Sequence, residues 1–73
     1  MTRTDSPKML AHQIETALHL RVGRHVHDLD VIVRAEGVIL RGQASTYYAK
    51  QLAQHIADRV SGLPVVANEI AVV

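Results

Sequence analysis

The chain has 73 residues, a formal net charge of +1, no cysteine, and neither phenylalanine nor tryptophan. This length allows one domain, and the missing cysteines exclude disulfides, thiolate catalysis and cysteine-ligated zinc. Because basic and acidic side chains are mixed along the sequence, the chain lacks the concentrated basic footprint of a nucleic-acid-binding protein, and no nucleic acid partner is expected.

The first predicted element is a helix over about residues 7–21. Ser6 is a favourable N-cap, and Pro7 suits the first helical position, where its missing N–H costs nothing. Apolar side chains then recur at the spacing of one helical face. The core that this face joins must be built from Val, Ile, Leu and Ala, which leaves little room for a deep pocket.

The N-terminal residues 1–6 are polar and are expected to form a disordered tail in front of a single domain over 7–73. They contain no apolar stretch that could act as a signal peptide. No later run approaches the length of a membrane span. A cytoplasmic location is therefore expected.

Two strands joined by a tight turn are expected next. Residues 29–35 and 38–44 alternate between apolar and polar side chains, which is the period of a strand with one buried face. Glu36 and Gly37 stand between them. Glycine at the second position is typical of a two-residue hairpin turn, where it supplies a positive φ angle.

This turn also fixes the pairing of the two strands. It places Val33 opposite Leu40 and brings every inward-facing residue of one strand against an inward-facing residue of the other. Gly42 falls on the inner face near the end of its strand. A residue without a side chain there allows a bulge or the close approach of another backbone, expected to be that of the following helix.

A second helix and a third strand complete the predicted domain. Ser45 or Thr46 caps the helix, and Gly62 ends it in the left-handed conformation. The expected buried stripe of this helix consists of Ala49, Leu52, Ala53, Ile56, Ala57 and Val60. In the last strand, 65–73, Asn68 is either accommodated on the inner face or placed at a bulge. The order α-β-β-α-β describes an α+β fold.

Short motifs follow one another in a fixed order over residues 10–73. A strand leads to E-G and to V-x-L-x-G, here VILRG; Ser45 follows two residues later, then a helix bearing Ala49 and Ala53, and finally VSGL and VANEIAV. This ordered set resembles the BON domain, the bacterial osmotic-stress and nodulation module. The resemblance implies a three-stranded mixed sheet with two helices on one face, and a non-enzymatic role at phospholipid surfaces or in protein contacts. Many members of that family are periplasmic.

The histidine, acidic, serine and threonine residues form no pattern that predicts a catalytic or metal site. His25 and His27 are two residues apart with Asp28 beside them, a set that suits zinc or nickel, but no third ligand is fixed. Ser45 and Thr46 have neither a histidine nor a carboxylate at a catalytic spacing. We therefore expect no enzymatic activity, no metal and no cofactor.

The outward face of the predicted hairpin supplies candidate binding residues, because two helices cover only one face of a small sheet. Ile32 and Ile39 lie there as diagonal neighbours, with Arg34 and Arg41 on the other diagonal. An apolar centre with two guanidinium groups suits an anionic phospholipid surface. It equally suits a self-complementary homodimer interface. The alternative is that scattered exposed Ile and Val have no partner.

Tyr47 and Tyr48, the only aromatic residues, complete the candidate binding set at the start of the second helix. Tyrosine is common at membrane and protein interfaces alike, although one of the two could instead fill part of the core. The expected function is that of a weak phospholipid-binding module. The alternative is a protein interaction or homodimerisation module with no lipid role, in which Ile32 and Ile39 become buried.

Overall fold

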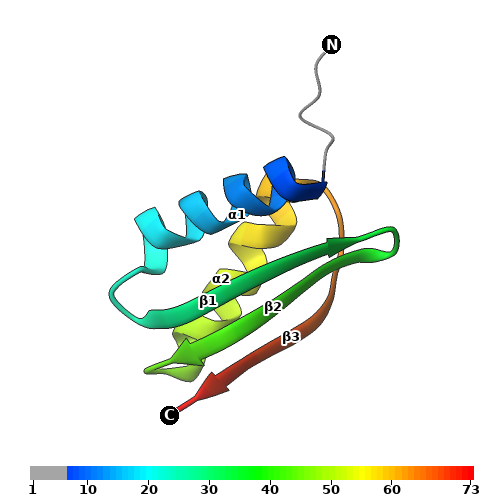
Figure 1. Ribbon diagram of the computed structural model, residues 1–73. Coiled ribbons are helices and arrows are strands. Elements are labelled where there is room, and N and C mark those ends of the chain that lie inside the picture. Colours follow the sequence, from blue (N-terminus) through cyan, green and yellow to red (C-terminus); the bar gives the residue numbers. More distant parts are fainter. Residues whose placement is uncertain (1–6) are drawn as a thin grey trace.

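The computed structural model describes residues 7–73, which form two layers: a three-stranded sheet and two helices packed on one of its faces (Figure 1). The elements in chain order are α1 (Pro7–Val22), β1 (Val26–Arg34), β2 (Gly37–Ala44), α2 (Tyr47–Ser61) and β3 (Val65–Val72). The central strand β2 is antiparallel to β1 and parallel to β3. The predicted α+β fold with a mixed sheet is confirmed. The Ser6 cap and the tail over 1–6 lie outside the described residues.

The core fills the space between the two layers. Its members from α1 are Ile14, Leu18 and Val22, spaced by four residues so that they lie on one side of the helix. The alanines of α2, at 49, 53 and 57, are all buried and allow this helix to pack close to the sheet. The stripe predicted for α2 ends earlier than expected, since Val60 is 42% exposed.

The hairpin between β1 and β2 turns one residue earlier than predicted. Its turn residues are Ala35 and Glu36, and Gly37 is already part of β2. The predicted pairing of Val33 with Leu40 is therefore wrong, because Val33 faces Val38. The register has moved by two residues, an even number, so the same side chains still point toward the helices.

Gly37 is required by its contact with the chain entering β3 and not by the turn. Its φ angle is 147°, and a β-carbon placed on it would lie 2.3 Å from the carbonyl oxygen of Pro64. The same oxygen accepts a 2.9 Å hydrogen bond from the Val38 N–H. Glycine thus lets the start of β3 pass directly against the start of β2.

A bulge in β1 lies opposite Gly42. The register shifts between His27 and Asp30, so that Asp28 and Leu29 together face this glycine. Asp28 has a φ angle of 54°, and a β-carbon on Gly42 would lie 2.9 Å from the His27 carbonyl oxygen. The close approach predicted at Gly42 is confirmed, but the backbone that approaches is the bulge of β1 and not α2.

Thr46, and not Ser45, caps α2. The Thr46 Oγ1 accepts a 3.0 Å hydrogen bond from the Ala49 N–H. Ser45 instead joins two loops, because its N–H donates a 2.9 Å bond to the His25 carbonyl oxygen and its Oγ lies 3.3 Å from His25 Nδ1. Gly62 ends the helix at a φ angle of 69°, as predicted.

Asn68 is accommodated on the inner face of β3 by hydrogen bonds to α2. Its Nδ2 donates to the Lys50 carbonyl oxygen and to Gln54 Oε1, both at 3.1 Å, and its Oδ1 accepts from the Ile70 N–H at 3.2 Å. The alternation therefore continues through Asn68 to the buried Ile70. A bulge does occur in this strand, at Val66.

Candidate functional site

The outer face of the sheet, which neither α1 nor α2 covers, carries the four strand residues predicted to bind a partner (Figure 1). Ile32 and Ile39 are direct cross-strand partners and not diagonal neighbours, because of the shifted register, and both are half-buried. Arg34 lies beside the hairpin turn, whereas Arg41 lies opposite Asp30. The structure thus brings the two isoleucines together and separates the two guanidinium groups.

Acidic side chains neutralise the positive charge of this outer face. The Arg41 Nε donates a 2.8 Å hydrogen bond to Glu69 Oε1 on β3, and Asp30 is the cross-strand neighbour of Arg41 on β1. An exposed ion pair of this kind adds at most about 1 kcal/mol to stability, but it cancels the field that an anionic ligand would meet. With Arg34 included, the outer face carries two basic and two acidic side chains.

Charge is divided unequally between the two layers. The helix layer, residues 7–25 and 45–64, has five basic and two acidic side chains, a net charge of +3: Lys8, Arg21, Arg24, Lys50 and Arg59 against Glu15 and Asp58. The sheet layer, residues 26–44 and 65–73, has a net charge of −2: Arg34 and Arg41 against Asp28, Asp30, Glu36 and Glu69. The net charge of the chain is therefore close to zero although the helix layer is positive and the sheet layer is negative.

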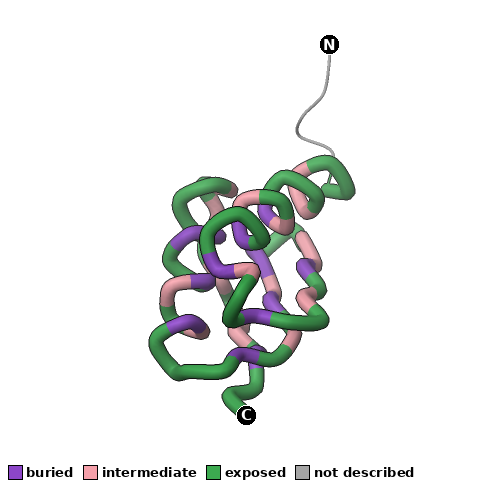
Figure 2. The backbone as a smooth tube through the Cα atoms, turned by 90° about the vertical axis from the view of Figure 1, so that its left-hand side faces the viewer, coloured by how far each residue is buried: buried purple, intermediate pink, exposed green. Residues whose placement is uncertain are grey.

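Three of the basic residues gather at one end of the helix layer. There the last turn of α1 and its loop, 19–25, meet the start of α2, 45–50, through the contacts between Ser45 and His25. We call these two segments the basic end. They contain Arg21, Arg24 and Lys50 and no acidic residue. Figure 2 views the molecule from this side, where the backbone of the loops is largely exposed.

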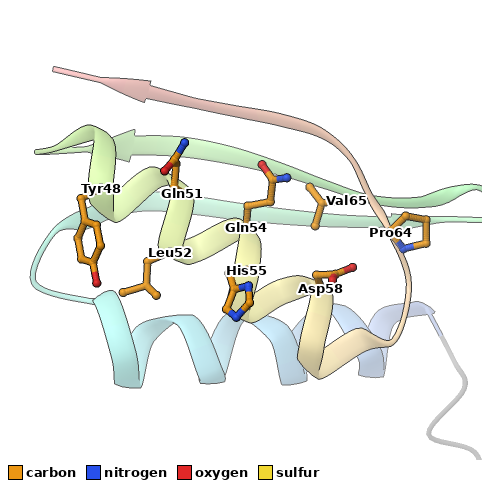
Figure 3. A pocket seen from close by; sticks show the side chains of 8 residues that line it. All are labelled: Tyr48, Gln51, Leu52, Gln54, His55, Asp58, Pro64 and Val65. Carbon is orange, nitrogen blue, oxygen red and sulfur yellow. The ribbon is translucent and has the colours of Figure 1, made fainter.

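The basic end also exposes large apolar and aromatic side chains. Leu20 is 78% exposed, Tyr48 73% and Tyr47 62%. The alternative in which one tyrosine fills part of the core is therefore wrong. Figure 3 shows Tyr48 pointing from the start of α2 toward the C-terminal end of α1. Positive charge and exposed apolar surface thus occupy the same end of the domain.

Shallow grooves connect this end with the side of α2. One, of about 650 Å³, is lined by residues that include Tyr48, Leu52 and His55 (Figure 3). Another, of about 470 Å³ between the helices, is lined by Arg21, Arg59 and the same Leu52 and His55. Both grooves are open to solvent, so they suit contact with a surface better than enclosure of a small molecule.

Over residues 7–73, no three side chains of the metal-binding types come together in a way that could hold an ion. In the sequence, the nearest approach to a metal site was the spacing of His25 and His27. His25 instead faces the hydroxyl of Ser45. None of the helices in this range is long and apolar enough to cross a bilayer.

Comparison with protein-family models matches residues 8–73 to the BON domain. This match covers almost the whole chain. The chain belongs to the BON domain family. The predicted resemblance is confirmed, and BON domains are binding modules and not catalytic ones. Searches of curated proteins and of solved structures found no match.

The basic end of this BON domain was not predicted from the sequence. Arg21 and Arg24 lie more than twenty residues before Tyr47, and no local pattern links the two segments. The sequence feature that could have indicated this surface is the lack of acidic residues in both 19–25 and 45–50. Only the contact between the loops shows that these two stretches form one surface.

Proposed function

We propose that this BON domain binds anionic phospholipid surfaces, and binds them weakly as a single domain. The observation that supports this function is the division of charge between the layers. Each basic residue held near an anionic membrane surface contributes about 1 kcal/mol. A helix layer with a net charge of +3 therefore supports a weak attraction.

The shape of the domain favours an extended partner over a small ligand. The two grooves beside α2 are open, and their shared residues are a partly buried leucine and an exposed histidine. A small-molecule site is normally concave and encloses most of its ligand. A membrane surface requires no such enclosure, because many headgroups present their phosphates side by side.

Flotation of the purified full chain with vesicles tests the proposed function. We expect the protein to float with vesicles of equal parts phosphatidylglycerol and phosphatidylcholine at low salt, because the helix layer is positive. Flotation should fall at high salt, where the Debye length shrinks to about 3 Å at 1 M. Pure phosphatidylcholine vesicles are the control. Flotation with neither vesicle type would count against lipid binding, and equal flotation with both would count against the proposed preference for anionic lipid.

Homodimerisation through the outer face of the sheet is the second candidate function. It is favoured by the uncovered Ile32–Ile39 pair and by the alternation of basic and acidic side chains around it, which allows a second copy to match it. Sedimentation equilibrium should then show a mass that rises with concentration and a salt-sensitive dimer. A strictly monomeric mass at high micromolar concentration would remove this candidate.

A further inference from the structure

We propose that the basic end, residues 19–25 and 45–50, is the surface with which this BON domain docks on anionic phospholipid. In this arrangement the guanidinium groups of Arg21 and Arg24 contact lipid phosphates, and Leu20 enters the apolar boundary beneath them. This inference rests on the proposed function and assigns it to one surface. It keeps Tyr47 and Tyr48 from the binding set predicted from the sequence, but replaces the outer face of the sheet by the basic end.

The charged side chains within the basic end are all basic. Neither of its two segments contains Asp or Glu. The nearest acidic residues along the chain are Glu15, four residues before the first segment, and Asp28, in the bulge of β1. On the outer face of the sheet, by contrast, Arg41 is paired with Glu69 at 2.8 Å. A phosphate would have to compete with a carboxylate there, but not at the basic end.

Apolar and basic side chains are immediate neighbours at this surface. Leu20, Arg21 and Arg24 line one shallow hollow of about 480 Å³ at the end of α1. The Leu20 side chain is 78% exposed. Interfacial segments combine basic residues, which meet headgroups, with a leucine or aromatic side chain, which enters the acyl boundary. Tyr47 and Tyr48 add two amphipathic rings that suit the headgroup level.

The basic end is held in place before any lipid arrives. The Gly23 N–H donates to the His19 carbonyl oxygen at 3.1 Å and the His25 N–H donates to the Val22 carbonyl oxygen at 2.9 Å. Ser45 then joins this loop to the start of α2. Little ordering of the backbone is therefore required on docking, which favours binding by a small surface.

Matched pairs of arginine variants separate the two surfaces. The double variant Arg21→Gln/Arg24→Gln removes two charges from the basic end, and Arg34→Gln/Arg41→Gln removes two from the sheet face, so both change the net charge equally. We expect the first to lower partition onto the anionic vesicles about 25-fold, about five-fold for each residue. We expect the second to lower it less than about five-fold, because Arg41 is paired with Glu69 on a different face of the domain.

A neutral variant tests the apolar contribution. Leu20→Ser leaves the charge unchanged and should lower partition about ten-fold, because the leucine no longer leaves water on docking. This side chain is exposed, so the fold should be retained. Far-UV circular dichroism of each variant verifies the fold.

Tyrosine fluorescence reports on docking of the unsubstituted protein. Tyr47 and Tyr48 are the only aromatic residues, so all aromatic emission comes from the basic end. Their quenching by acrylamide should fall when anionic vesicles are added. If wild-type protein does not float, the proposed function itself fails. If it floats while the tyrosines remain quenchable and only the Arg34/Arg41 variant is impaired, lipid binding stands and this docking surface is overturned.

Discussion

Replacing Leu18 with alanine is expected to lower the free energy of unfolding by about 3 kcal/mol. The Leu18 side chain is 0% exposed and lies between Ile14 and Val22 on the buried side of α1. Alanine removes most of its apolar contacts and leaves a cavity above the sheet. For a domain of 73 residues, whose total stability is roughly 4–10 kcal/mol, this loss is a large share.

Leu20→Ala is the matched control, two residues further along the same helix. Because Leu20 is 78% exposed, we expect its truncation to change stability by no more than about 0.5 kcal/mol. Urea unfolding followed by far-UV circular dichroism measures both variants. Equal losses would contradict the orientation of α1, and with it the exposure of Leu20 on which the docking surface depends.

Gly37→Ala is expected to destabilise the domain by about 2–4 kcal/mol. The added methyl group would lie 2.3 Å from the carbonyl oxygen of Pro64, a contact with backbone that no side-chain rotation relieves. Either β2 and the start of β3 separate, with loss of the hydrogen bond from the Val38 N–H, or the hairpin moves. The first route weakens the pairing of β3 with β2.

Gly62→Ala distinguishes the effect of space from that of backbone conformation. Gly62 has a φ angle of 69°, but no atom lies within 4 Å of a β-carbon placed on it. Only the left-handed conformation then opposes the substitution, at about 1 kcal/mol. The two variants are compared by urea unfolding. A greater loss for Gly62→Ala than for Gly37→Ala would show that Gly37 is not packed as described.

The fold could be predicted because the signals that determine it are local and periodic. The alternation in β1 and β2 identified the inner faces correctly even though the register was wrong by two residues. The error came from reading Gly37 as a turn residue. Its actual neighbour is Pro64, and a contact between residues so far apart in the chain leaves no trace in the pattern around either one.

The candidate site could be predicted only in part, for the same physical reason. Tyr47 and Tyr48 were selected because they are the only aromatic residues, and they are indeed exposed. The favourable reading of Arg41 assumed that nothing opposed its charge. The Glu69 that pairs with it comes from β3, whose bulge at Val66 determines which residue lies beside Arg41. The strand register, and not the composition, determines which charged side chains are neighbours on that face.

The separation of charge between the layers gives this BON domain an electric dipole moment although its net charge is only +1. In the electric field of a charged surface, such a molecule rotates before it is appreciably attracted to that surface. An anionic surface would rotate an approaching domain until its helices point forward, within a Debye length of about 8 Å at physiological ionic strength. A cation-exchange resin would act in the same way. Retention on both should therefore depend on orientation more than on total charge.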